Sequence, residues 1–235
     1  FGSPPAMGLL EGVTGQSGGP GGSKSASDIT AINATVNLDR DGRPTYDPLS
    51  LTCTWDPADP SAIAVLAAIQ SAAPAAVACE LGTSLGTTPG VQFSGYINSF
   101  GLKIPNEGPC EMTTGIAITS ALTKAANTSV TPNAAYDPET GQGALFKWYV
   151  TNAFVTAVGV ENVEFSGMSR VAVPTTEMSA TAPTSLPGSR VRGNVSWDML
   201  YDTAEARQVL MEAAYAASDQ VDQIQILLPN SAKTV

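Results

Sequence analysis

The alternation of apolar and polar residues predicts a chain built mainly from β-strands. Apolar side chains recur at every second position in many short segments, the pattern of a strand with one buried face. Turn-forming residues stand between several of them, as at Asp39–Pro44 and Leu186–Gly188. The predicted strands are Ile29–Leu38, Leu49–Trp55, Val77–Leu81, Val91–Phe100, Gly115–Leu122, Trp148–Val158, Val163–Val173, Val191–Trp197 and Ile224–Leu228.

Two alanine-rich segments carry helical spacing instead. Asp59 stands before Pro60, which favours a helix start because Asp accepts bonds from first-turn amides and Pro tolerates the first helical position. Pro74 ends this helix. A second helix is predicted from Asp202, which precedes Glu205 by three residues. The residues that share one face are Ala62, Leu66, Ile69 and Ala73 in the first helix and Ala206, Leu210, Ala213 and Ala217 in the second.

The order strand, helix, strand occurs twice in the chain. The two Trp-Asp pairs lie 142 positions apart, and the central leucines of the two helices lie 144 apart. This spacing predicts two equivalent modules at residues 28–123 and 145–235, with a linker at 124–144 and a flexible Gly/Ser/Pro-rich arm at 1–27. The second module lacks a counterpart of the Val91–Leu122 hairpin. Either the sequence is incomplete there, or a neighbouring chain or the arm fills the gap in the sheet.

Several residues are predicted to form the structural core. Trp55 and Trp197 each stand in an alternating strand just before a helix, where they join helix to sheet. Phe93 is expected to pack beside them, and Gly95 allows close backbone approach. Leu66 and Leu210 are the central core residues of the two helices.

Composition and charge narrow the function classes. Of the 235 residues 43% are hydrophobic and only 14% are charged, which favours a folded protein whose surface is largely covered by neighbours. The net charge of −10 is opposite to what binding a phosphate backbone requires. A protein that binds nucleic acid is therefore disfavoured, although a protein surface that repels DNA is compatible with this charge.

The sequence contains no pattern that predicts a catalytic, cofactor-binding or metal-binding site. There is no histidine, which excludes Ser-His-Asp and Cys-His systems. The three widely spaced cysteines predict buried free thiols. The carboxylate pairs Asp137/Glu139 and Glu161/Glu164 fall where a linker or strand edge is expected, which disfavours a glycosidase. No apolar run reaches the length that spans a bilayer. We therefore expect a protein that is not an enzyme.

The succession of elements resembles the tail tube (major tail) protein of long-tailed bacteriophages. The resemblance covers about residues 28–122 and 150–230. In the first half it rests on Thr30–Thr35, the turn with Gly42 and Pro44, Leu49–Trp55, the short helix with its following strand, and Phe93–Ile97 with its hairpin. In the second half it rests on Phe165–Gly167, Thr175–Met178, Leu186–Gly188 and Trp197–Asp198.

The resemblance implies two tandem β-sandwich modules, each with one flanking helix. In that family the inner sheets of neighbouring domains join around a lumen through which the genome passes, and loops and arms bridge stacked rings. Three two-module chains would supply a pseudo-sixfold ring, and a hexamer is the alternative. The implied partners are further copies of the chain, the tape measure and tail tip or terminator proteins, and passing DNA, with no membrane. The implied location is the virion tail, after assembly in the host cytoplasm.

An acidic channel would repel phosphates, so that DNA slides through it. The candidate lumen carboxylates are Asp39, Asp41, Glu80, Glu161 and Glu177, each of which has the alternative of a solvated surface charge. The alternative function is a β-sandwich module for receptor or glycan binding and adhesion, in which Trp55 and Trp197 would stack on a sugar.

Overall fold

The computed structural model describes residues 10–19, 22–28, 39–71, 76–81, 89–120, 122–126, 137–150, 153–175, 185–216 and 223–229. The fold is mainly β, as predicted. The strands are β1 Val13–Gly18, β2 Gly22–Asp28, β3 Asp39–Tyr46, β4 Leu49–Thr54, β5 Val77–Leu81, β6 Pro89–Pro105, β7 Glu111–Ile118, β8 Thr123–Ala126, β9 Leu145–Val150, β10 Ala153–Thr156, β11 Val160–Pro174, β12 Ser185–Val191, β13 Asn194–Met199 and β14 Ile224–Leu227. The helices are α1 Pro60–Gln70 and α2 Ala206–Ala216.

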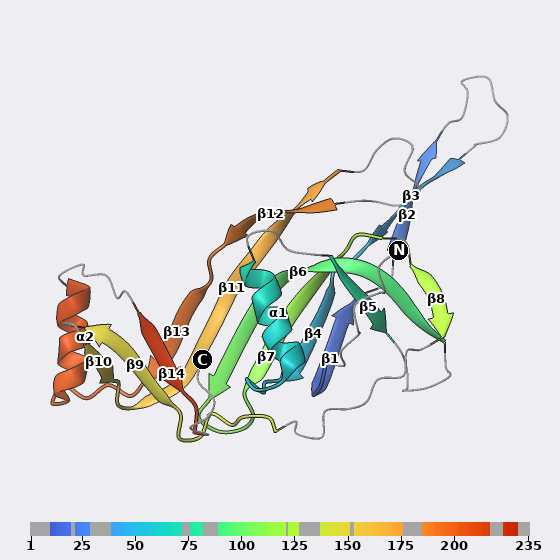
Figure 1. Cartoon of the computed structure of the whole chain (residues 1–235). Coiled ribbons are helices and arrows are strands. Elements are labelled where there is room, and N and C mark those ends of the chain that lie inside the picture. The colour runs from blue at the N-terminus through green and yellow to red at the C-terminus, as the bar shows by residue number, and fades with distance from the viewer. Residues whose placement is uncertain are drawn as a thin grey trace.

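A nine-stranded antiparallel sheet forms the body of the molecule (Figure 1). Its main path runs β1-β4-β7-β6-β11-β12, with β13 also on β11 and with β5 and β8 on β6. A three-stranded sheet, β10-β9-β14, is separate from it, and β2 and β3 form a hairpin of their own. In Figure 1, α1 crosses in front of the large sheet and the small sheet lies near the β13 end.

The core lies on one face of the large sheet because apolar residues alternate along its strands. On β4, Leu49, Leu51 and Cys53 are buried, whereas the residues between them are half-buried. Trp55 follows β4 and meets the ring of Phe100 at 6.2 Å in an edge-on arrangement. The small sheet adds Phe146, which contacts the Trp197 ring at 4.9 Å. Thus α1 and the small sheet both cover the same face.

Gly95 occurs where β6 approaches β7 closely. A Cβ atom there would stand 2.5 Å from the carbonyl oxygen of Ala117 and 2.9 Å from Cγ2 of Ile116. No side chain fits that space, so the prediction of a close backbone approach at Gly95 is confirmed.

The two halves of the sequence share one sheet. Strand β6 pairs with β11 from Asn162 opposite Pro105 to Ser169 opposite Ser99. The buried Arg170 side chain donates from Nη2 to the carbonyl oxygens of Ile69, at 3.0 Å, and Ser71, at the end of α1. Its cross-strand neighbour Arg190 donates to the Gln70 carbonyl. The predicted linker at 124–144 is therefore not a break in the sheet.

The repeat predicted from the sequence has a structural counterpart. Strand β1 pairs antiparallel with β4 before α1, and β11 pairs antiparallel with β13 before α2. The strands that follow the helices differ, because β5 joins the large sheet through β6 and β14 joins the small sheet through β9. The β4–α1 and β13–α2 units are thus alike, but the strand that follows each helix joins a different sheet.

Several sequence predictions are wrong in detail. The arm at 1–27 contains β1 and β2, because pairing with β4 and β3 overrides the weak strand propensity of Gly and Ser. The turns expected at Asp39–Pro44 and Leu186–Gly188 lie inside β3 and β12. The single strand expected at Trp148–Val158 is the antiparallel pair β9 and β10. The strand expected at Ile29–Leu38 lies outside the described residues.

Candidate functional site

The large sheet is open at both margins. Within the described residues, β1 pairs only with β4 at one end, and β12 and β13 pair only with β11 at the other (Figure 1). Each unpaired margin presents backbone N–H and C=O groups to which another strand can bind. These two margins are the first part of the candidate site.

The two margins are complementary in direction. All neighbours along the path β1-β4-β7-β6-β11-β13 are antiparallel, so β1 and β13 run in opposite directions. A β1 strand from a second copy in the same orientation can therefore add to β13 as one more antiparallel strand. Head-to-tail repetition of that contact closes a ring and removes both free margins.

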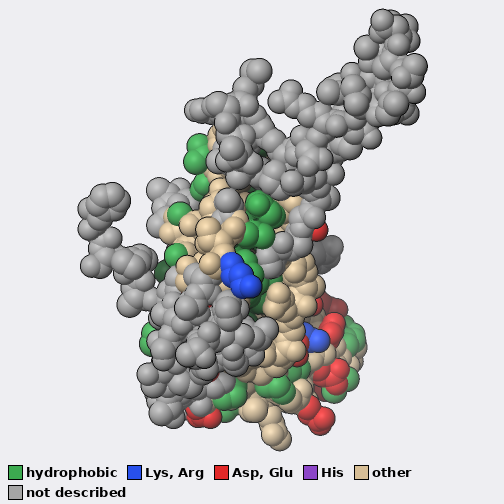
Figure 2. Space-filling model, turned by 90° about the vertical axis from the view of Figure 1, so that its right-hand side faces the viewer, with side chains coloured by type: hydrophobic (Ala, Val, Ile, Leu, Met, Phe, Trp, Pro, Cys, Tyr) green, Lys and Arg blue, Asp and Glu red, His purple; other side chains and the backbone are tan. Residues whose placement is uncertain are grey.

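The β1 margin has no charged residue or proline against such pairing, although its register with β4 shifts between Val13 and Gly15, as at a β-bulge. Proteins block free strand edges with charged residues or prolines, and Val13–Gly18 contains neither. Figure 2 views the molecule from the right-hand side of Figure 1, and charged side chains are sparse over much of the coloured surface there, with acidic ones gathered at its lower end. A surface of this kind suits contact with another protein.

The second part of the candidate site is the face of the large sheet opposite the core, which we call the polar face. Its residues follow from the register of the strands. One row crosses five strands through small residues, Ser17, Ser50, Gly115, Ser99 and Ser169, and continues on β12 at the exposed Val191. The next contains Gly15, Thr52, Thr113 and Gly101. The short hydroxyl and glycine residues make the surface of these two rows flat and uncharged.

A third row on the polar face carries the charge. It crosses the sheet through Thr54, Glu111, Lys103, Glu164 and Ser196, so the single lysine stands between two carboxylates. Asp198 lies next to it and accepts a 3.4 Å hydrogen bond from the Asn162 amide. A shallow open groove of about 500 Å³ follows the β7, β6 and β11 part of this face. The charged row thus lines a hollow with a net negative charge.

The predicted lumen carboxylates are scattered. Glu80 lies on the polar face by register, opposite Gln92, whose amide donates to it at 3.0 Å. Glu161 instead lines a small cleft with Ile104 and Phe146, side chains of the core. Asp39 and Asp41 belong to β3, outside the large sheet, and Glu177 lies outside the described residues.

Sequence reasoning missed Glu111, Glu164 and Asp198 as polar-face carboxylates. Each stands beside a residue that packs in or against the core, namely Met112, Phe165 and Trp197. Period-2 alternation could have identified all three, because neighbours along a strand point to opposite faces.

Five of the six predicted core residues lie in or against the core. Trp55 and Phe93 are 2% and 4% exposed, and Gly95 sits in its close contact. Leu66 and Trp197 are partly buried against the core. Leu210 is 45% exposed, so its predicted core role is wrong. The reason is that α2 has no covering layer over this side within the described part of the chain.

The cysteines are free thiols, as predicted, and Cys53 and Cys110 are buried, whereas Cys79 is only half-buried, so the prediction of burial is wrong for Cys79. Burial raises the pKa of Cys53 and of Cys79 to about 11. Burial and then the nearby Glu139 carboxylate raise the pKa of Cys110 to about 12. All three thiols therefore stay protonated and unreactive near neutral pH. The described residues contain no cluster of three or more Cys, Asp or Glu side chains arranged to hold a metal ion.

No protein-family model and no curated protein matches this sequence. Among the helices described, neither is both long and apolar enough to cross a membrane.

Proposed function

We propose that this chain is a structural subunit of a bacteriophage tail tube, which assembles with its own copies into stacked rings around a DNA-conducting lumen. The observation that carries the proposal is the open sheet, whose β1 and β13 margins run in opposite directions and whose main core cluster packs on one face. Closing such sheets head to tail places the covered face outside and the polar face inside.

The number of strands fits a channel. Six strands lie along the path from one margin to the other. Three copies would contribute about 18 strands, and closed sheets of roughly that number enclose a water-filled channel. With strands about 4.8 Å apart and tilted by about 40°, such a ring is roughly 35 Å across at the backbone. We therefore favour the trimeric ring over the hexamer.

The polar face suits the passage of DNA without binding. Proteins that hold a phosphate backbone use clusters of Lys and Arg, whereas the charged row here has Lys103 between Glu111 and Glu164. Two of the remaining rows carry small hydroxyl and glycine residues, which offer little for a phosphate to contact. DNA in such a channel is repelled from the wall and slides.

Electron microscopy of the purified chain in negative stain tests this function. We expect rings or tubes with a central hole in axial views. A chain that stays monomeric and binds glycans would support the adhesion alternative and contradict the proposal. That alternative has little support, because the Trp55 ring is buried and Trp197 packs against Phe146.

The acidic lining has a separate test. Replacing the polar-face carboxylates together by Glu111→Gln, Glu164→Gln and Asp198→Asn leaves Lys103 uncompensated, so assembled particles should retain duplex DNA at low salt in a gel-shift assay. Glu107→Gln is the matched control, because Glu107 is an exposed carboxylate in the turn between β6 and β7. If the triple variant retains no more DNA than the control, the polar face does not face the DNA.

A further inference from the structure

The two equivalent helices differ in how much of their surface is covered. Helix α1 packs over β6 and β11, and Ala62 and Ile69 on it are buried. Helix α2 leaves Val209 and Leu210 46% and 45% exposed. Of its described side chains only Gln208 is buried. The repeat thus contains one covered helix and one uncovered helix.

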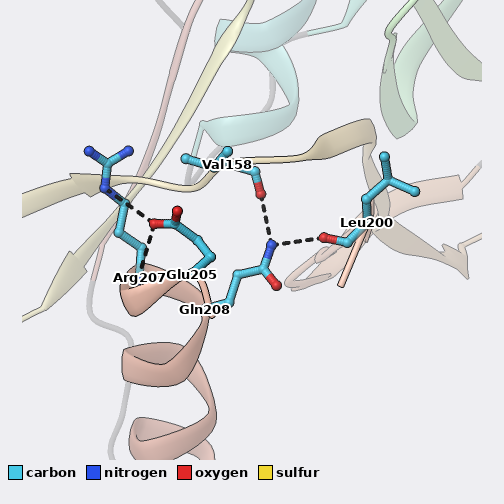
Figure 3. Close-up of polar contacts among 5 residues, drawn as sticks. All are labelled: Val158, Leu200, Glu205, Arg207 and Gln208. Atoms are coloured by element: carbon cyan, nitrogen blue, oxygen red, sulfur yellow. Dashed lines mark hydrogen bonds and ion pairs between the residues drawn. The ribbon is translucent and has the colours of Figure 1, made fainter. Parts of the chain in front are cut away.

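Exposed apolar residues surround α2 and are held there by specific contacts. Gln208 Nε2 donates to the carbonyl oxygens of Val158, at 3.2 Å, and Leu200, at 2.8 Å (Figure 3). Its Oε1 accepts from the Asp202 amide at 2.7 Å. These bonds fix the start of α2 against the chain before β11 and after β13. We use the name α2 apolar face for the exposed apolar residues on and next to this helix, namely Val158, Leu200, Tyr201, Val209 and Leu210, each at least 42% exposed.

The internal repeat indicates what covers this face. Helix α1 follows β4 and lies over the junction where β6 meets β11, which is the first large-sheet strand of the second half. Strand β11 pairs with β13 as β1 pairs with β4, so the counterpart of β11 in a following unit is β1 of a second copy. In Figure 1, α2 lies beyond β13, at the end of the molecule opposite β1.

The β1 margin carries a matching exposed residue. Val13 lies opposite the buried Cys53, so it belongs to the core face of the sheet, yet it is 47% exposed. Nothing charged flanks it along the rest of β1. An apolar side chain on the core face of one margin therefore matches an apolar helix at the other.

We infer that the α2 apolar face docks on the β1 margin of a second copy of this chain and covers its Val13. The inference rests on the proposed head-to-tail assembly, and it adds a contact outside the sheet to the strand pairing. In that arrangement α2 lies at the seam between copies, next to β13 and without counterparts of β7 and β6, whereas α1 lies over the β6–β11 junction within one copy.

A charge on α2 tests the contact. Leu210→Glu places a carboxylate in the proposed interface but on a surface exposed in the single chain, so the monomer should fold normally. Ile63→Glu is the matched control, because Ile63 is 50% exposed on α1. In sedimentation velocity we expect Leu210→Glu to weaken self-association at least tenfold and the control to stay within twofold of wild type. Thermal unfolding of both monomers by circular dichroism verifies the fold.

Cross-linking identifies the partner surface. A Val13→Cys, Leu210→Cys double variant in a Cys79→Ser background should form a ladder of covalent multimers on mild oxidation, whereas each single variant stops at dimers. Cys53 and Cys110 are fully buried and do not compete. Wild-type assembly with no effect of Leu210→Glu, or with no ladder, overturns this inference and leaves the proposed function standing. A wild-type chain that stays monomeric overturns both.

Discussion

Removing the Arg170 guanidinium tests whether the two halves form one folded body. Arg170 belongs to β11, in the second half, and its side chain donates to the Ile69 and Ser71 carbonyls at the end of α1, in the first. Arg170 is 6% exposed and its bond to Ile69 is buried, so the Ile69 carbonyl loses its partner without gaining water. A cation at a helix C-terminus also stabilises the helix dipole.

The expected loss is smaller than the sum of the two bonds. A hydrogen bond from a charged group contributes about 1.5–3 kcal/mol. Arg170→Met also removes a buried charge whose Nε has no partner among the described residues, and this offsets part of the loss. We therefore expect about 2–3 kcal/mol of destabilisation. For a chain of this size that lowers Tm by roughly 5–10 °C.

Differential scanning calorimetry of the dilute monomer measures this effect. Arg190→Met is the matched control, because its one bond to the Gln70 carbonyl is exposed to solvent, and its Tm should fall by less. A single shifted transition in Arg170→Met supports the shared body. An unchanged Tm, or two separate transitions in the wild type, would refute the reasoning.

Three further predictions concern packing and titration. Gly95→Val should abolish soluble expression, checked against wild type on a gel, because its Cβ would overlap the Ala117 carbonyl oxygen; normal yield would contradict this. Gln208→Leu should lower the free energy of unfolding, measured by urea titration, by about 2 kcal/mol, because three hydrogen bonds are lost. A change below about 0.5 kcal/mol would show that Gln208 does not hold α2 in place. Burial raises the pKa of Cys53 from 9.0 to about 11, and burial together with the Glu139 carboxylate raises that of Cys110 to about 12. The contribution of these thiols to stability is therefore full below pH 9 and is lost as the pH rises towards 11–12. Between pH 8 and pH 10.5 the urea midpoint should fall less in Cys53→Ala than in wild type. An equal fall in both proteins would refute the raised pKa of Cys53.

The sequence predicted the elements whose own residues determine them. Alternation identified β5 and β11, and Asp59 identified the start of α1, where its side chain accepts from the Ala62 amide at 3.2 Å. Strand β1 could not be predicted in this way, because Val-Thr-Gly-Gln-Ser-Gly has little strand propensity and depends on its pairing with β4. Local patterns identify strands that bury a face, and miss those ordered mainly by a partner.

The candidate site was harder to predict for the same reason. Whether a carboxylate lies on the polar face depends on the strand register, which places Glu111 and Glu164 on either side of Lys103 from three separate segments. The exposure of Leu210 likewise could not be read from its helical spacing. Spacing shows which residues share a face, but not whether another element covers that face.

Hydrogen exchange at the two sheet margins tests the central claim most directly. Backbone amides of Val13–Gly18 and Asn194–Met199 that point away from β4 and β11 should exchange at least tenfold more slowly in assembled particles than in dilute monomer, because strands of neighbouring copies bind them. The amides of β7, which is paired on both sides, should change little. Particles that assemble while both margins exchange as fast as in the monomer would contradict edge-to-edge closure.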